Sequence, residues 1–345
     1  MRGRLIRQAY PPTARFAQTP IASHFPDFPV DFYSPGVVLM LALSGVIPPV
    51  VTPLLAHDQL DPAAVDRVVN HLIQGEVNGL FALGTTGEGP SLNYQIRYEM
   101  VERTCAAAAG RVPVLVGVTD TSLSESLALA EHADSCGAAA IVAAAPFYFE
   151  ASQGALTQWF WRLADESPLP LILYNMPSCV GVTLSLELVA ALASHPNVIG
   201  IKDSGGDLRY FKQLCVEFRK PGRFSVFMGP EELLADAVAL GGDGGVCGGA
   251  NLLPSVYSSL YRAAVRSDAS EIPHWHAVIH ELFASVYRDE SGRMKLIPGL
   301  KHAMSLIGLC QPVIAPPLAE LSSEHAERIR SAIDRLVVAG APISR

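Results

Sequence analysis

Apolar runs alternate with longer amphipathic stretches along the chain from residue 46 onwards. The eight apolar runs cover residues 46–51, 79–84, 113–118, 138–145, 169–175, 198–203, 224–229 and 242–248. The runs are continuous rather than strictly alternating, which is typical of parallel strands that are covered on both faces. The stretches between them have the apolar spacing of helices. The pattern therefore predicts eight strands separated by helices.

Two of the helical stretches carry start signals. Asp61 stands immediately before Pro62 and "AAVDRVVNHLI", which predicts an N-cap followed by proline at the first helical position. Ser122 has Glu125 three residues later, which is the pattern of a capping box. We expect helices that begin at Pro62 and directly after Ser122.

Eight strand–helix units predict an α/β fold, a (β/α)8 TIM barrel over residues 45–268. A doubly wound sheet is the alternative, but it usually has fewer units and a clear switch point. The strand pattern ends near residue 268, and three helical patterns follow at roughly 271–289, 296–308 and 318–339. Residues 269–345 are therefore expected to form a C-terminal region of three helices.

Residues 1–44 differ in kind from the rest of the chain. The first 20 residues contain four arginines and no acid, and prolines recur up to Pro35. A transit peptide has such a composition, but the prolines leave no helical face. We expect a poorly ordered N-terminal extension. The alternative is that the sequence starts at an upstream start codon and that Met40 is the true beginning of the protein.

Composition narrows the possible partners and the compartment. The net charge is −8, and the sequence has no basic stripe with interleaved aromatic residues. Both observations argue against a nucleic-acid partner. No run of about 18 apolar residues predicts a membrane span. The six cysteines are scattered singly, which favours a reducing cytoplasm over a disulfide framework or a zinc site. His274, His276 and His280 fall in the C-terminal region, and we interpret them as structural or solvated rather than as metal ligands.

Polar residues follow several of the predicted strands. In a (β/α)8 barrel the loops after the strands form the catalytic face. These segments are residues 84–89, 146–149, 174–178, 202–207, 229–232 and 247–251. They converge on one mouth if the barrel prediction is correct.

Lys202 ends the apolar run "VIGI" and is the first of only five lysines in the chain. An ammonium held in an apolar mouth loses solvation, so more of it is the neutral amine, which is the nucleophile for a carbonyl. A strand-end lysine that reaches water is the alternative. Tyr174 could relay protons or be a core tyrosine, and Tyr148 could relay protons or cover the mouth.

Two glycine-rich segments could bind anions. "GTTGEG" places Thr85 and Thr86 in a turn that leads toward a helix near Asn93, which suits a carboxylate. The segment "GGDGGVCGGAN" (241–251) could bind a phosphate. Asp243 within it and the two glutamates at 231–232 would, however, repel a phosphate. Close packing of helix on strand is the explanation we favour for these glycines.

The motifs together resemble one known family. "GTTGEG" (84–89), "YNMP" (174–177), "GIKD" (200–203) and "GLKHAMSLIG" (299–308) occur in the order and spacing of the dihydrodipicolinate synthase / N-acetylneuraminate lyase family. The resemblance extends from about residue 46 to about residue 309.

The resemblance implies a site and an assembly. Lys202 would form an imine with a 2-oxo acid, usually pyruvate, and Tyr174 would be the proton relay. Thr85 and Thr86 would bind the pyruvate carboxylate. Tyr148 would reach into the active site of a neighbouring subunit in a homotetramer built as a dimer of dimers. No cofactor or metal is expected, because the covalent imine on Lys202 performs that role.

Departures from the family pattern bear on the substrate. Cys179 stands where the synthases carry an arginine for the carboxylate of the aldehyde substrate, and a thiol cannot make that bidentate pair. Ser204 and the pair Glu231 and Glu232 match the hydroxyl-binding positions of the lyases. The two glutamates could also simply favour a helix N-terminus. Gly248 replaces a serine of the lyases, so a full sialic-acid site is not expected.

Four functions remain open from the sequence. The leading hypothesis is a Schiff-base class I aldolase or lyase that converts a 2-oxo-3-deoxy sugar acid, or a related hydroxy-oxo acid, to pyruvate and an aldehyde. A dihydrodipicolinate synthase (4-hydroxy-tetrahydrodipicolinate synthase) and a 2-oxo-acid dehydratase are the alternative enzymes. A sensor that binds a 2-oxo acid without turnover is the alternative outside catalysis.

Overall fold

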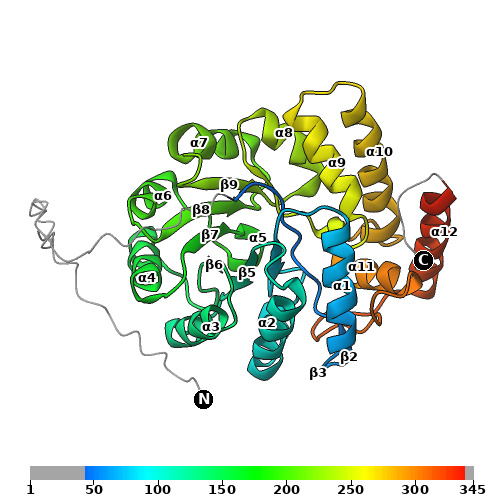
Figure 1. The fold of residues 1–345 in the computed structure, drawn as a ribbon, viewed down its shortest axis with the longest axis horizontal. Helices are drawn as coiled ribbons and strands as arrows, with labels where there is room; N and C mark the ends of the chain where they lie inside the picture. The colour runs from blue at the N-terminus through cyan, green and yellow to red at the C-terminus, as the bar shows by residue number, and fades with distance from the viewer. Residues whose placement is uncertain (1–42, 339–345) are drawn as a thin grey trace, which may run out of the picture. The chain divides into compact units, whose positions relative to one another are not determined.

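Eight parallel strands form the centre of the molecule in the computed structural model, which describes residues 43–338 (Figure 1). Their order in the sheet is β1-β10-β9-β8-β7-β6-β5-β4, so neighbours in the chain are neighbours in space. The strands are β1 (Gly45–Val46), β4 (Leu80–Ala82), β5 (Val114–Gly117), β6 (Ala140–Ala144), β7 (Leu171–Asn175), β8 (Val198–Asp203), β9 (Ser225–Met228) and β10 (Gly244–Gly245). Seven of the eight predicted apolar runs contain one of these strands whole, and the first run, 46–51, overlaps β1 at Val46.

The two end strands of this sheet meet and close the barrel. A parallel bridge joins Pro49 to Phe81, and the Phe81 N–H donates to Pro48 O at 2.9 Å. The Val50 N–H donates back to Phe81 O at 2.8 Å. Pro48 and Pro49 have no N–H to donate, which is why β1 is short although the apolar run continues. The predicted TIM barrel is confirmed, and the doubly wound alternative is excluded.

Helices surround the barrel. They are α1 (Pro62–Gln74), α2 (Tyr94–Ala108), α3 (Leu123–Ser135), α4 (Gln153–Glu166), α5 (Pro177–Val180), α6 (Leu186–Ala193), α7 (Leu208–Phe218), α8 (Leu234–Ala239) and α9 (Pro254–Val265). Short 3₁₀ turns lie at η1 (Gly89–Ser91), η2 (Glu231–Leu233) and η3 (Gly248–Asn251), and β2 (Leu54–Ala56) pairs with β3 (Gln59–Leu60) in a hairpin.

The two predicted helix starts are observed. Asp61 Oδ1 accepts the N–H of Ala64 at 2.9 Å, with Pro62 as the first residue of α1. Ser122 Oγ accepts the N–H of Glu125 at 3.4 Å. The other half of the expected capping box differs, because the Ser122 N–H donates to Asp120 Oδ1 at 3.0 Å instead of to Glu125.

Three helices follow the barrel, as the pattern predicts. They are α10 (Glu271–Leu282), which continues into the π-helical turn η4 (Phe283–Tyr287), α11 (Leu296–Leu306) and α12 (Ser323–Val338). The predicted start of the last helix at 318 is wrong. Two prolines lie at 316–317, and the Oγ of Ser322 accepts the N–H of His325 at 3.0 Å, so the helix begins after this serine.

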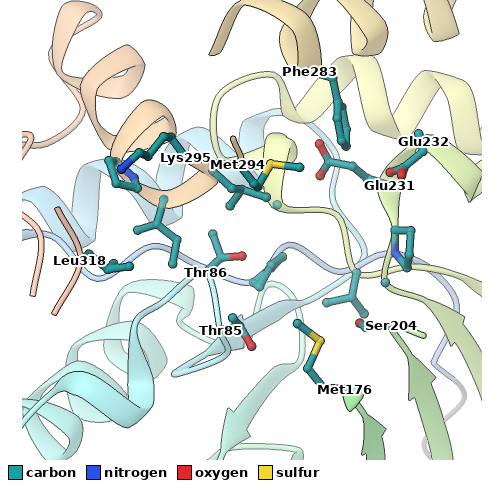
Figure 2. A pocket seen from close by; sticks show the side chains of 18 of the residues that line it. Thr85, Thr86, Met176, Ser204, Glu231, Glu232, Phe283, Met294, Lys295 and Leu318 are labelled. Atoms are coloured by element: carbon teal, nitrogen blue, oxygen red, sulfur yellow. The ribbon is translucent and has the colours of Figure 1, made fainter. Parts of the chain in front are cut away.

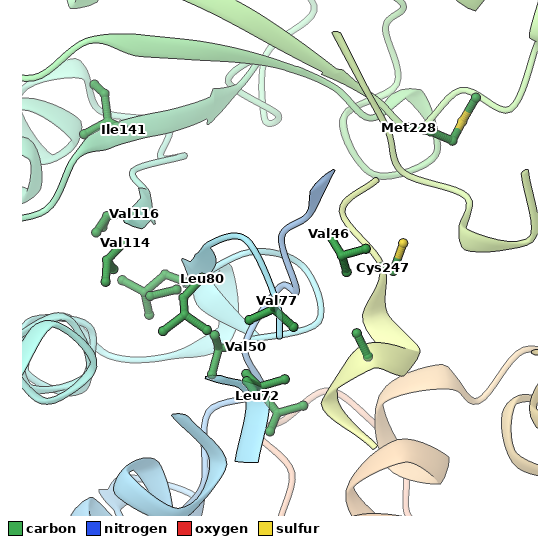
Figure 3. Close-up of a cluster of buried hydrophobic side chains, with 14 of the residues drawn as sticks. Val46, Val50, Leu72, Val77, Leu80, Val114, Val116, Ile141, Met228 and Cys247 are labelled. Carbon is green, nitrogen blue, oxygen red and sulfur yellow. The ribbon is translucent and has the colours of Figure 1, made fainter. Parts of the chain in front are cut away.

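Alternation along the strands divides the core into two clusters. Val114, Val116 and Ile141 belong to the cluster outside the barrel, which also contains helix residues such as Leu72 of α1 (Figure 3). The intervening strand residues form a second cluster inside the barrel. Its larger side chains are Ile47, Phe81, Leu115, Ile172, Tyr174 and Phe227. Because this interior is filled, ligands have access only at the mouth.

The predicted N-terminal extension, residues 1–44, lies outside the described residues apart from Leu43 and Ser44. In the described range, no helix combines the length and apolar character that a bilayer span requires. Residues 339–345 at the other end also lie outside it.

Candidate active site

Lys202 and Tyr174 are at the same level inside the barrel. The register of the parallel strands pairs Tyr174 of β7 with Lys202 of β8, and Lys202 with Phe227 of β9. The Lys202 Nζ lies 4.1 Å from the centroid of the Tyr174 ring and 5.2 Å from that of Phe81. Only 5% of Lys202 is exposed. The strand therefore delivers an amine into an aromatic, largely dry site, as the sequence predicts.

The threonine loop reaches the same point from the opposite side. The Tyr174 hydroxyl lies 3.1 Å from Thr85 Oγ1, in the loop that follows β4. This loop is fixed by the Thr52 hydroxyl, which donates to Gly87 O at 2.6 Å, and by the Glu88 N–H, which donates to Thr85 O at 3.0 Å. The structure thus joins the lysine, the tyrosine and the threonines that the sequence singles out.

A cavity of about 680 Å³ opens above these residues (Figure 2). The barrel contributes eight of the residues predicted from the sequence: Thr85, Thr86, Tyr174, Lys202, Ser204, Glu231, Glu232 and Gly248. The C-terminal region supplies the outer wall, with Phe283, the segment 294–298 and the segment 317–319. Sequence reasoning missed this wall, because its residues are mostly apolar and carry no catalytic signal.

Asn175 and Asp203 support the site from behind. Asn175 Nδ2 donates to Asp203 Oδ1 at 2.7 Å, and the Gly205 N–H donates to the same oxygen at 3.0 Å. The Ser204 N–H donates to Asn175 O at 2.8 Å, which fixes the residue that lines the cavity. Burial raises the pKa of Asp203 above its ordinary value, and the hydrogen bonds from Asn175 and Gly205 oppose that rise. Both residues stand inside the quoted motifs, but sequence reasoning gave them no role.

The carboxylate of Glu231 takes part in a buried hydrogen-bond network. Its Oε1 accepts the hydroxyls of Tyr257 at 2.6 Å and Tyr287 at 3.0 Å, and its Oε2 accepts the Gly249 N–H at 2.6 Å. Burial raises the pKa of this carboxyl group, while the hydrogen bonds lower it by a smaller amount. Because these bonds already occupy both oxygens, Glu232, which is partly exposed, is the acid with more freedom to meet a substrate hydroxyl.

Gly248 leaves room at the edge of the cavity. A Cβ atom there would lie 3.4 Å from Thr86 Oγ1 and 3.5 Å from Glu231 Oε2, which is ordinary contact distance. The neighbouring Gly249 is different, since a Cβ atom would lie only 2.2 Å from the Tyr257 hydroxyl. The close contact at Gly249 agrees with packing as the reason for the glycines in this segment.

A buried ion pair lies beneath the threonine loop, and sequence reasoning also missed it. Lys301 of α11 and Glu88 form a salt bridge in which neither side chain is exposed. Lys301 Nζ donates to Val313 O at 2.7 Å, and Glu88 Oε2 accepts the Ala315 N–H at 2.6 Å. Burial lowers the pKa of Lys301, and the charge of Glu88 opposes that change. The pair joins the loop of Thr85 and Thr86 to the segment that leads into the outer wall.

Two of the predicted site residues do not line the cavity. Tyr148 lies in the loop after β6 and is 79% exposed, with its ring 5.1 Å from that of Phe149. Cys179 lies on α5 and is exposed. In this chain alone, neither side chain reaches the substrate space.

The histidines of α10 lie apart from the mouth. The rings of His276 and His280 are 6.0 Å apart, and neither residue lines the cavity. Within residues 43–338, no three His, Cys, Asp or Glu side chains are grouped as a metal site would require.

The fold and the site define a class of protein. A TIM barrel with a buried lysine, a tyrosine and a threonine converging at the carboxyl ends of its strands has the parts of a Schiff-base class I aldolase, a carbon–carbon lyase. The family model described as the dihydrodipicolinate synthetase family matches residues 42–336. The chain belongs to this family.

Individual relatives share most of the chain. It is 34% identical over 294 residues to a probable 2-dehydro-3-deoxy-D-pentonate aldolase, YjhH, of Escherichia coli K12, covering 84% of this chain and 96% of the relative. The solved dihydrodipicolinate synthase of Bacteroides thetaiotaomicron is 42% identical, with a TM-score of 0.82, covering 85% of this chain and 99% of that one. YagE of E. coli K12, solved in complex with pyruvate, is 29% identical with a TM-score of 0.78, covering 85% and 98%.

Proposed function

We propose that this protein is a class I aldolase that cleaves a 2-oxo-3-deoxy sugar acid to pyruvate and an aldehyde, or forms it from them. The observation that carries the proposal is the buried Lys202 amine beside Tyr174, whose hydroxyl lies 3.1 Å from Thr85 Oγ1. The relatives named for pentonate aldolase activity and for a pyruvate complex support the substrate class.

The reaction begins at Lys202. Its neutral amine attacks the C2 carbonyl of the substrate, water leaves, and a protonated imine forms. The C3–C4 bond then breaks, and its electron pair moves into the imine to give an enamine. The C4 hydroxyl loses its proton as the aldehyde forms. Protonation of C3 and hydrolysis of the imine release pyruvate and restore the lysine.

Tyr174 would transfer the proton, and the two threonines would bind the substrate carboxylate. The Tyr174 hydroxyl is in reach of Thr85 and is proposed to relay the C4 proton, accepting it as its own phenolic proton passes to Thr85 Oγ1. Thr85 and Thr86 hydroxyls and the N–H groups of their glycine-rich turn would bind the substrate carboxylate. Ser204 and Glu232 would contact hydroxyls of the aldehyde half. Glu231 and Gly248 border the same space.

The assembly and location belong to the same proposal. Tyr148 is proposed to enter the site of a neighbouring subunit in a homotetramer, and its 79% exposure at the loop after β6 supports this role. The same loop carries Phe147 and Phe149, which are 45% and 81% exposed. The protein is proposed to act in the cytoplasm without a cofactor.

Trapping of the imine tests the proposal. Borohydride reduction in the presence of pyruvate, followed by peptide mass spectrometry, should place the reduced pyruvate adduct on Lys202. Lys202→Ala should remove both the adduct and the activity, whereas Lys212→Ala, on the exposed face of α7, should change neither. An unmodified Lys202, or full activity in Lys202→Ala, would sink the proposal.

A synthase is the second candidate, favoured by the likeness to the Bacteroides thetaiotaomicron structure. The exposed Cys179, in place of the expected arginine, argues against it. Pyruvate release from a panel of 2-oxo-3-deoxy sugar acids, run beside condensation of pyruvate with aspartate semialdehyde, separates the two. A dehydratase would consume panel acids without releasing pyruvate, and a sensor would turn over none of them.

A further inference from the structure

Lys295 provides a positive charge at the outer side of the cavity. Among the described residues that line the cavity, Lys202 and Lys295 are the basic ones. Lys202 lies in the barrel, and Lys295 precedes α11 in the C-terminal wall. Figure 2 shows Lys295 on the side of the cavity opposite to Glu231 and Glu232. The substrate space is therefore polarised, with carboxylates on one side and an ammonium group on the other.

The backbone of Lys295 is fixed by short hydrogen bonds within the C-terminal region. The Lys295 N–H donates to Tyr287 O at 2.6 Å, and Lys295 O accepts the Gly299 N–H at 2.8 Å. Tyr287 is fully buried, and its hydroxyl donates to Glu231 at 3.0 Å. The wall that carries Lys295 is thus tied through Tyr287 to the loop after β9, so the backbone that bears this side chain is held in place.

The ammonium group of Lys295 has no partner in residues 43–338, whereas its basic neighbours do. Lys301 is paired with Glu88. In the hairpin before Lys295, Arg288 donates to Gly292 O at 2.8 Å, and Arg293 donates to Ser291 Oγ at 2.8 Å. Lys295 is partly buried, and a partly desolvated ammonium group gains most from an ionic acceptor.

We propose that Lys295 binds an anionic group, a carboxylate or a phosphate ester, at the end of the substrate remote from the imine. The inference rests on the proposed aldolase function and specifies its substrate class. A cavity of about 680 Å³ is far larger than pyruvate needs, so the aldehyde half extends toward the wall. Cys179 offers no cation for that end, and Glu232 would repel an anion while accepting hydroxyl hydrogen bonds.

Three aldehydes of equal chain length test the proposal in the condensation direction. Glyceraldehyde, tartronate semialdehyde and glyceraldehyde 3-phosphate share an aldehyde and a 2-hydroxyl, and they differ only in an uncharged, carboxylate or phosphate end. Each is assayed by pyruvate consumption with the wild-type protein, Lys295→Gln, Lys295→Arg and the surface control Lys212→Gln. The two charged aldehydes distinguish which anion is preferred.

We expect the wild-type protein to favour at least one charged aldehyde over glyceraldehyde in kcat/KM. Lys295→Gln should lower kcat/KM for that aldehyde roughly 10-fold, mainly through KM, because a charge-assisted hydrogen bond is lost. Glyceraldehyde should be nearly unaffected. Lys295→Arg should keep the preference, and Lys212→Gln should change neither value. The ratio between aldehydes is independent of how much variant is correctly folded.

Equal losses for charged and uncharged aldehydes in Lys295→Gln, or no preference in the wild-type protein, would overturn the inference. Borohydride trapping of pyruvate on Lys202 is run on the same samples. If no adduct forms in any protein, the proposed function itself fails. If the adduct forms throughout but the charge preference is absent, only the role of Lys295 fails.

Discussion

At the scale of single residues, the contact between Tyr174 and Thr85 carries the proposed proton relay. Their oxygens lie 3.1 Å apart, and Lys202 Nζ lies 4.1 Å from the tyrosine ring centroid. A phenol so placed can reach the substrate and a second hydroxyl at once, which is what a proton relay requires.

Tyr174→Phe should therefore lower kcat by about 100-fold or more, the usual contribution of a positioned acid or base, while the ring still packs beside Lys202. Borohydride trapping should still label Lys202 after long incubation. The matched control is Tyr210→Phe, which removes a hydroxyl that donates to Leu184 O at 2.6 Å, away from the cavity. Similar kcat values for the two variants would contradict the relay.

Glu231 should give the protein a particular response to pH. Burial raises its pKa above the ordinary value of 4.5, so the folded state holds this proton more tightly than the unfolded state does. Stability therefore falls as pH rises from 4.5 through the folded-state pKa. Glu231→Gln removes this titration, so the Tm of the wild-type protein should decline relative to the variant across that range. Parallel Tm curves for the two proteins would refute the effect.

At the scale of elements, the pair of Glu88 and Lys301 fastens α11 to the loop after β4. The pair also holds the backbone of Val313 and Ala315 through single hydrogen bonds. Both side chains of this salt bridge are fully buried, so each charge is neutralised only by the other. Removing one residue leaves an uncompensated buried charge.

Lys301→Met should lower the free energy of unfolding by about 3–5 kcal/mol, the usual cost of breaking a buried pair. The double variant Glu88→Leu with Lys301→Met should recover much of that loss, since no lone charge remains. Urea unfolding followed by circular dichroism measures both. A double variant that is less stable than Lys301→Met would show that the pair is not coupled in this way.

The elements were predictable to different degrees. Strands and the residues at their ends follow from local patterns, so Lys202, Tyr174, Thr85 and Thr86 could be found from the sequence. The partners of Glu231 could not, because Tyr257 and Tyr287 lie 26 and 56 residues away and meet it only through the packing of the last helices. The ion pair of Glu88 and Lys301 could not be predicted for the same reason, because the two residues meet only through tertiary packing.

At the scale of the whole molecule, the first barrel strand, β1, pairs with the last, β10. Gly244 has φ +154°, and a Cβ atom on it would lie 2.0 Å from Gly45 O. The neighbouring strands approach so closely here that backbone, not a side chain, would have to move. This junction explains why the last apolar run is rich in glycine.

Gly244→Ala should therefore destabilise the protein by about 1–3 kcal/mol or more, as overpacking and backbone strain combine. Gly154→Ala is the opposite case, since it lies in α4 with nothing within 4 Å of an added Cβ atom. It should stabilise the protein by roughly 0.5–1 kcal/mol. Thermal unfolding of both variants measures the difference. Equal Tm values for the two would disprove the close junction.

The outer wall of the cavity has a practical consequence. Lys202, Tyr174 and the threonines belong to the barrel, whereas Phe283 and the segments 294–298 and 317–319 belong to the C-terminal region. The site can therefore be treated as two modules for directed evolution. Under the proposed function, a library confined to the wall would vary the aldehyde that is accepted while leaving Lys202 in place. Trapping of pyruvate would then serve as a screen for intact folding, scored separately from any new substrate.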